Sequence, residues 1–295
     1  MRRSAQQGFT LLELIVVMVL LGILATGAGL LINRPIEAYQ DQQRRQMLVD
    51  AAEMALRKLA TDIRHALPNS LRVVDNSPDG WVLELVPAVD AGRYRDENGG
   101  GHDTADDRLE FTAADDAFNL MGGFTRLSAA SPAAAYPAYR LVVYNTAPWQ
   151  IYPQAASGSN PGVVSQPGFS LLSNASEPRL RLDVAHRFPL ASPAQRVYVV
   201  EQPVSYVCDA AAGTLTRYAG YGFVASQAAI DSDAELAARP GVEVARMTRH
   251  VDACGILYQP GSALRSGLVT LRLGLSDSRG GRVSLLHQVH AANAP

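Results

Sequence analysis

Three groups of side chains in this 295-residue sequence have types and spacings suited to specific chemistry. Glu13 is a carboxylate five positions after Gly8, inside an otherwise apolar run. Cys208 and Cys254 are the two cysteines of the chain, and an acidic segment occupies residues 96–107. These groups suggest charge pairing, a disulfide and cation binding, respectively. Each interpretation depends on the elements that position the side chains.

The apolar run that contains Glu13 is long enough to cross a membrane as a helix. From residue 9 to residue 32 it reads FTLLELIVVMVLLGILATGAGLLI, and after Glu13 its one polar side chain is Thr26. The 19 residues that follow Glu13 would span about 28 Å as a helix, close to the thickness of a bilayer's hydrocarbon core. Arg2 and Arg3 precede the run, so the positive-inside rule leaves the amino terminus in the cytoplasm.

Two alternatives compete at this terminus. A cleaved secretory signal would end in small residues, and Ala25-Thr26-Gly27 is a weak match to such a site. The chain continues through Asn33-Arg34-Pro35 into a second helical pattern, which favours a retained helix. Glu13 either reaches the membrane interface or meets a positive partner within an assembly, because an unpaired carboxylate in lipid costs several kcal/mol.

The stretch Gly8-Phe9-Thr10-Leu11-Leu12-Glu13-Leu14, after a short basic leader, resembles the signal of type IV pilins and pseudopilins. The resemblance implies that residues 1–8 are a leader, and that a prepilin peptidase cuts between Gly8 and Phe9 and methylates the new amine of Phe9. It implies that Glu13 pairs with the amino terminus of a neighbouring subunit. Other minor and major pilins and the inner-membrane assembly platform would be partners.

In that family the apolar helix, here residues 9–33, first anchors the subunit in the bacterial inner membrane, with the head in the periplasm. It later becomes the core of the pilus or pseudopilus. Residues 34–67 continue it as an amphipathic helix with six basic and five acidic side chains on its polar face. The expected apolar stripe consists of Ile36, Tyr39, Met47, Ala51, Ala52, Ala55, Leu59, Ile63 and Ala66.

The remainder, residues 68–295, is rich in short β-branched and aromatic runs typical of strands. The predicted strands are Leu71–Val74, Trp81–Val86, Arg108–Thr112, Tyr139–Tyr144, Leu180–Val184, Val197–Val200, Val204–Cys208, Leu215–Tyr218, Leu268–Leu275 and Val283–Val289. Hairpins are expected around residues 209–213 and 276–281, a helix over 231–238, and surface loops over 128–137 and 150–168. The predicted fold is α+β: a long amino-terminal helix packed on antiparallel sheet, with an enlarged β-rich head.

Further stretches narrow the resemblance. Val204–Cys208, Arg249–Gly255 and His287–His290, with Ala51–Arg57 and Gly92–Arg95, resemble the MshO family of minor pilin-like biogenesis proteins of the mannose-sensitive haemagglutinin (MSHA) pilus. A head as large as residues 68–295 is hard to repeat along a tightly packed fibre, which suggests a low copy number at the pilus tip or in an initiation complex. J-type pseudopilins of type II secretion share the layout and stay open as an alternative. A membrane-anchored ligand-binding protein is a second alternative, although it would need neither Gly8 nor Glu13.

The cysteines and the acidic segment complete the candidate sites. Cys208 and Cys254 would lie in an oxidising compartment, where a disulfide closing 47 residues would contribute about 4 kcal/mol; two buried thiols are the alternative. Residues 75–116 hold 12 carboxylates against 3 arginines, a net charge of −9. Asp96, Asn98, Asp103 and Asp107 would be the Ca²⁺ ligands of a loop with EF-hand-like spacing, although Gly100 replaces one usual ligand. The alternative is a flexible acidic loop.

Several function classes are disfavoured. A net charge of −2, from 26 basic and 28 acidic residues, argues against nucleic-acid binding through bulk charge. No nucleophile elbow, Walker loop, HExxH or strand-linked GxGxxG motif is present. The sequence therefore predicts a non-enzymatic protein without a cofactor, unless the acidic segment binds Ca²⁺.

Overall fold

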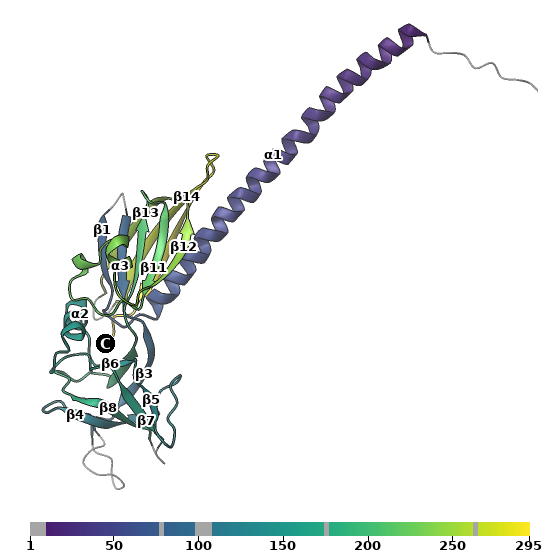
Figure 1. Cartoon of the computed structure of the whole chain (residues 1–295). Helices are drawn as coiled ribbons and strands as arrows, with labels where there is room; N and C mark the ends of the chain where they lie inside the picture. The colour runs from purple at the N-terminus through teal and green to yellow at the C-terminus, as the bar shows by residue number, and fades with distance from the viewer. Residues whose placement is uncertain (1–9, 77–79, 98–107, 174–176, 262–264) are drawn as a thin grey trace, which may run out of the picture.

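The computed structural model describes residues 10–76, 80–97, 108–173, 177–261 and 265–295, with the side chains of residues 27–38 and 76 left aside. It combines a long amino-terminal helix with antiparallel sheets (Figure 1). The predicted α+β class, with a helix packed on antiparallel sheet and a large β-rich region, is confirmed.

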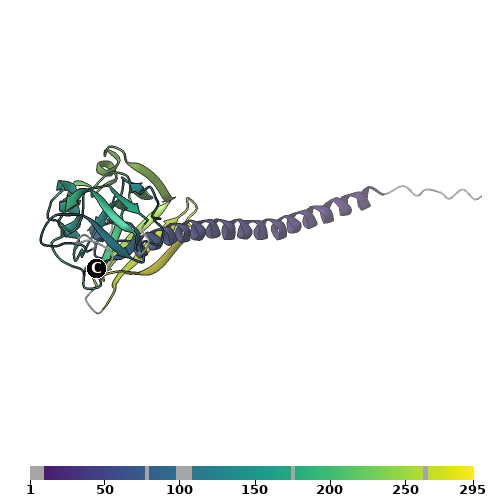
Figure 2. The ribbon, with the colours of Figure 1, turned by 90° about the horizontal axis from the view of Figure 1, so that it is seen from below.

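Helix α1 runs without interruption from Leu11 to Arg64, 54 residues or about 81 Å. Thr10 caps its start, since its side-chain oxygen accepts the backbone N–H of Glu13 at 3.3 Å. At the other end the N–H of His65 returns to the carbonyls of Thr61 and Ile63. The first half of α1 projects away from the head, and the second half lies against it (Figure 1, Figure 2).

The docked half of α1 buries a stripe of residues three or four positions apart. These residues are Leu48, Ala52, Ala55, Leu56, Leu59, Ala60 and Ile63. The predicted stripe is correct from Ala52 onward but wrong for Tyr39 and Met47, whose side chains are 63% and 67% exposed. Leu48, the next residue, is buried instead. The inward face of the helix at this point therefore lies about 100° around the helix axis from the predicted one.

Two layers enclose the core against which α1 packs. The first is a five-stranded antiparallel sheet in the order β1-β2-β10-β11-β12, with β1 at Arg72–Asn76, β2 at Gly80–Leu85, β10 at Val204–Asp209, β11 at Thr214–Ala219 and β12 at Glu243–Arg249. The second contains β13 (Val251–Gln259), β14 (Gly267–Ser276) and β15 (Arg282–Ala291). Helix α1 extends this layer beside β15.

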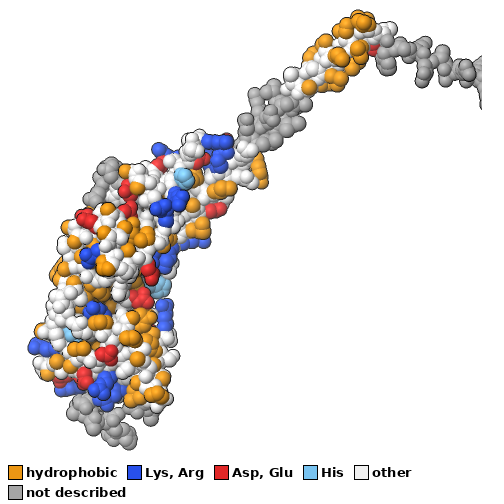
Figure 3. All heavy atoms as spheres, in the orientation of Figure 1, with side chains coloured by type: hydrophobic (Ala, Val, Ile, Leu, Met, Phe, Trp, Pro, Cys, Tyr) orange, Lys and Arg blue, Asp and Glu red, His pale blue; other side chains and the backbone are white. Residues whose placement is uncertain are grey.

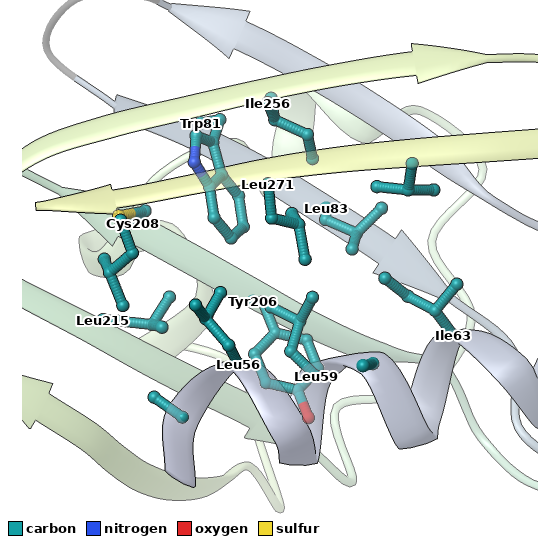
Figure 4. Packing of buried hydrophobic residues seen from close by; sticks show 14 of the residues in the cluster. Leu56, Leu59, Ile63, Trp81, Leu83, Tyr206, Cys208, Leu215, Ile256 and Leu271 are labelled. Carbon is teal, nitrogen blue, oxygen red and sulfur yellow. The ribbon is translucent and has the colours of Figure 1, made fainter. Parts of the chain in front are cut away.

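The core lies between these layers (Figure 4). Leu56, Leu59 and Ile63 point from α1 towards Tyr206 of β10 and Leu83 of β2 (Figure 4). The predicted hairpins β10–β11 and β14–β15 are confirmed, each with a continuous antiparallel register.

The chain passes from the first layer to the second at His250, which has a positive φ of 63°. The N–H of Val251 donates to the carbonyl of Gly213 at 3.1 Å, and the N–H of Ser276 donates to the carbonyl of His250 at 2.9 Å. In the structure Cys208 of β10 and Cys254 of β13 form a disulfide with their Cα atoms 6.1 Å apart. This bond joins the two layers of the sandwich.

A second lobe lies beyond the carboxyl end of α1 (Figure 1). Its seven-stranded sheet has the order β5-β7-β8-β4-β3-β9-β6, with β3 at Ala88–Tyr94, β4 at Asp115–Met121, β5 at Ala134–Tyr136, β6 at Arg140–Val142, β7 at Phe169–Leu172, β8 at Arg179–His186 and β9 at Arg196–Val200. This lobe has a core of its own, which includes Tyr94, Phe118, Phe169 and Phe188. Helix α2 (Pro148–Ser157) lies where the two lobes meet, and α3 (Asp233–Ala237) covers the outer face of the five-stranded sheet.

Three predicted elements need correction. The predicted strand Arg108–Thr112 is wrong, because the Glu110 carboxylate accepts the N–H groups of Phe111 and Thr112 and the Thr112 hydroxyl, and so folds the chain into a turn. The predicted loop 150–168 begins within α2, and the predicted loop 128–137 contains β5. The predicted helix at 231–238 is confirmed as the shorter α3, capped by Ser232.

Candidate functional site

The free end of α1 is an apolar arm, defined here as residues 11–26. Its twelve large apolar side chains, from Leu11 to Leu24, are between 46% and 77% exposed. Figure 3 shows these side chains along the projecting helix. A helix that is apolar on all sides is stable only within lipid or among other apolar helices. The arm therefore requires an apolar environment that the described parts of this chain do not provide.

Glu13 is the one charged residue of the apolar arm. The other polar side chain, Thr26, donates its hydroxyl hydrogen within the helix, towards the carbonyl oxygens of Gly22 at 3.1 Å and Ile23 at 2.9 Å. The Glu13 carboxylate, in contrast, has no hydrogen bond or ion pair to any residue that the structure describes. An apolar environment around the arm would thus leave one uncompensated carboxylate near its tip, which a cation could neutralise.

The predicted processing residues Gly8 and Phe9 lie outside the described residues. Both residues lie within a segment that matches a known family. Residues 3–29 match the family model of the prokaryotic N-terminal methylation motif. The match supports a type IV pilin-like protein. No curated protein and no solved structure matches the chain.

No helix among the described residues is long and apolar enough to span a membrane. The predicted span, residues 9–33, includes Phe9 and the side chains of residues 27–33, which are not among those described.

The base of α1 is fixed to the head by a charged cluster around Asp62. Its carboxylate accepts hydrogen bonds from Lys58 Nζ at 2.7 Å, the Tyr206 hydroxyl at 2.7 Å and Arg217 Nε at 3.2 Å. Partial burial raises the pKa of Asp62, but hydrogen bonds from Lys58 and Tyr206 and the charges of Lys58 and Arg217 outweigh it, so the net pKa is lowered. The ionised carboxylate holds the helix base against β10 and β11.

The acidic segment is described only at its start. Asp96 is exposed, whereas Asn98, Asp103 and Asp107 lie outside the described residues. Arg95, just before Asp96, forms a two-point ion pair with Glu177, at 2.6 and 3.0 Å. Within the described ranges, no group of three or more His, Cys, Asp or Glu side chains is placed to hold a metal ion. Calcium binding by this segment stays a prediction.

The head contains a buried ion pair that the sequence does not predict. Glu84 of β2 is 0% exposed and lies 2.5 Å from Arg72 Nε of β1. Burial raises the pKa of Glu84, against the effects of Arg72 and of the Tyr221 hydroxyl, which donates to its carboxylate at 2.9 Å. Arg72 also donates to the carbonyls of Val224 and Ala225. Strand pairing across the β1–β2 hairpin places Arg72 opposite Glu84.

Proposed function

We propose that this chain is a minor pilin-like subunit of an MSHA-type type IV pilus, comparable to MshO, and that it acts at the tip or in the initiation of assembly. The observation that carries the proposal is the continuity between the methylation motif of residues 3–29 and the exposed apolar arm of α1. A motif for processing is thus joined to a helix that needs apolar partners.

The proposed sequence of events starts in the inner membrane. Prepilin peptidase would remove residues 1–8 and methylate the amine of Phe9, which keeps its positive charge. The Glu13 carboxylate of one subunit would then pair with the amino terminus of its neighbour while the arm exchanges lipid for other apolar helices. Because an unpaired charge in that environment costs several kcal/mol, this pair would favour one axial position of the helix over others.

The second lobe supports a position at the end of the fibre. It lies beyond the carboxyl end of α1 (Figure 1), on the side away from the apolar arm. In a fibre of parallel helices, this is the space that the head of a neighbouring subunit farther from the membrane would need. The steric argument favours a low copy number at the tip or in an initiation complex with other minor pilins.

The proposal is tested by pilus counts in a strain that lacks the chain and is complemented with variants. Glu13→Gln keeps the size of the side chain and removes its charge, so we expect at least about a tenfold loss of pili. Glu53→Gln is the matched control on the same helix, where Glu53 pairs with Arg57 at 2.7 Å on the surface, and it should behave as the wild type.

Wild-type piliation of the Glu13→Gln strain would contradict the proposed pairing. Labelling of the chain evenly along the fibre would contradict the position at the tip. A deletion that leaves pili intact but abolishes protein secretion would assign the chain to a type II secretion pseudopilus instead.

A further inference from the structure

The two layers that enclose the core around α1 have unequal widths: one is the five-stranded sheet, and the other is formed by β13, β14, β15 and α1. Strand β13 packs over β2 and β10, and α1 lies over β12, so the second layer ends before it reaches β1. The inner face of β1, where Val73 is half-buried, and the free edge of β13 border a groove of about 720 Å³. Val73 of β1 and Leu71, the residue just before β1, line it on one side, and Ile256 and Tyr258 of β13 line it on the other.

Trp149 lies at the end of the groove where β1 begins. It lines the groove and is 77% exposed. The preceding segment is fixed beside the start of β1, because the Asn145 side chain donates to the carbonyls of Pro68 and Asn69 at 2.9 and 3.2 Å. A large exposed aromatic ring beside an apolar groove is an anchor typical of binding sites.

The edge of β13 is protected only at its ends, by Asp252 near its start and by Pro260 directly after its last residue. Between them, residues 253–259 contain no proline and no charged side chain, and within the described parts of the chain β13 pairs with β14 alone. Strand β12, in comparison, carries Glu243, Arg246 and Arg249, and the edge strands β5 and β6 have three residues each. Long uncharged edges are rare in soluble heads because they pair with other strands.

The layers restrict what can pair with this edge. If β13 of a second copy paired antiparallel with β13, the two copies would be related by a two-fold axis perpendicular to the joined sheet. Both five-stranded sheets would then lie on the same side of that joined sheet. The two β1 strands would then compete for the same space under the joined edge. A single extended segment has no such second layer. The volume of the groove also lies in the range of ligand sites, about 300–1,000 Å³. A groove of this size is small compared with the surface that two folded proteins bury between them.

The charges of the groove define the chemistry of the segment. Apart from Arg72 and Asp75, the residues that line it are uncharged, and Glu84 neutralises Arg72 at 2.5 Å. We propose that the groove binds an extended, uncharged peptide segment of a partner protein, which adds to the free edge of β13 as a strand. Its apolar side chains would rest on Val73 and against Trp149. This goes beyond the proposed role in the pilus.

The test uses the two tryptophans of the chain, of which Trp81 is 3% exposed and Trp149 is 77% exposed. The full-length chain in phospholipid nanodiscs is titrated with the peptide acetyl-Thr-Val-Thr-Val-Thr-Val-amide while tryptophan emission is recorded. Binding should shift the emission to shorter wavelength as Trp149 leaves water. The variant Trp149→Phe should lose this shift.

Two methylated peptides test for strand pairing itself. One carries N-methyl groups on its three valine amides, and the other on its three threonine amides. Alternate amides of a strand point to opposite edges, so exactly one of the two peptides should bind at least about tenfold more weakly than the parent. Equal affinities of the two peptides, or no emission shift with the parent peptide, would overturn the proposal.

A pair of protein variants locates the binding. Val73→Glu places a charge on the floor of the groove and should weaken binding at least about tenfold. Val184→Glu, at a 52% exposed position on β8 of the other lobe, should leave it unchanged. Unchanged affinity in a folded Val73→Glu variant would also overturn the proposal, and if that variant does not fold, the methylated peptides decide. None of these outcomes depends on fibre assembly, so failure here leaves the proposed function standing.

Discussion

Glu13 and Asp62 are carboxylates of the same helix in opposite surroundings. Asp62 has three hydrogen-bond donors from α1 and the head, whereas Glu13 lies in the exposed apolar arm without a partner among the described residues. Asp62 therefore contributes to the stability of the isolated subunit. Glu13 has a role only when a second chain or a membrane surrounds the arm.

The substitution Asp62→Asn should lower the free energy of unfolding by about 1–3 kcal/mol at pH 7, because a charge-assisted cluster is lost. The folded-state pKa of Asp62 is lowered, so its contribution is complete above the ordinary carboxyl pKa of about 4. It is lost as pH falls through the lowered folded-state value. Urea unfolding between pH 7 and pH 2 should therefore show the gap between wild type and variant closing on the acid side.

A matched control for this series is Asp50→Asn. Asp50 is exposed and accepts a hydrogen bond from Gln46 at 2.8 Å, so its replacement should change stability by less than about 0.5 kcal/mol. A gap between wild type and Asp62→Asn that stays constant down to pH 2 would contradict the role given to the ionised Asp62.

At the scale of the element, the docked half of α1 is part of the core and not an appendage. Leu59 is 0% exposed, whereas Met54 on the same helix is 67% exposed. Leu59→Ala should destabilise the head by about 2–5 kcal/mol through lost burial and a cavity, and Met54→Ala by less than about 0.5 kcal/mol. Urea unfolding measures both, and similar costs for the two variants would show that α1 does not pack as described.

The elements differ in how far their sequence predicts them. The β10–β11 and β14–β15 hairpins follow from alternating apolar residues around short polar turns, and both are confirmed. Helix α2 begins at Pro148 and contains Pro153. A prediction based only on neighbouring residues takes these prolines as signs of a loop. At Arg108–Thr112 the turn around Glu110 overrides the apolar pattern. The Glu110 carboxylate accepts hydrogen bonds, of which the one from the backbone N–H of Thr112 has the largest effect, and these lower the pKa of Glu110 to about 2.

At the scale of the whole molecule, the Cys208–Cys254 disulfide joins the two layers that enclose the base of α1. In the chain-entropy model a loop of this length contributes about 4 kcal/mol. We expect Cys208→Ala with Cys254→Ala to lower the free energy of unfolding by an amount of this order. The wild type in reductant should fall to the same value, as measured by urea unfolding.

Mass labelling with a thiol reagent provides the control for this prediction. Thiols of the native, unreduced chain that react at once would contradict the disulfide. A wild type whose stability does not change with reductant would contradict its contribution to the fold.

The candidate sites also differ in how far the sequence predicts them. The processing motif is continuous in sequence, so residues 8–13 identify it without knowledge of the fold. The groove, in contrast, cannot be predicted from a continuous stretch of sequence. Leu71 and Ile256 come from distant parts of the chain, and they share a groove only because the second layer ends at β13.

Processing and assembly of this chain as a pilin-like subunit can be tested by measuring its amino-terminal mass. The chain is purified after coexpression with and without its prepilin peptidase. With active peptidase, we expect a chain that begins at Phe9 and carries one added methyl group. An intact leader in the presence of active peptidase would contradict it, and so would a cut near residues 25–29 that releases the head as a secreted protein.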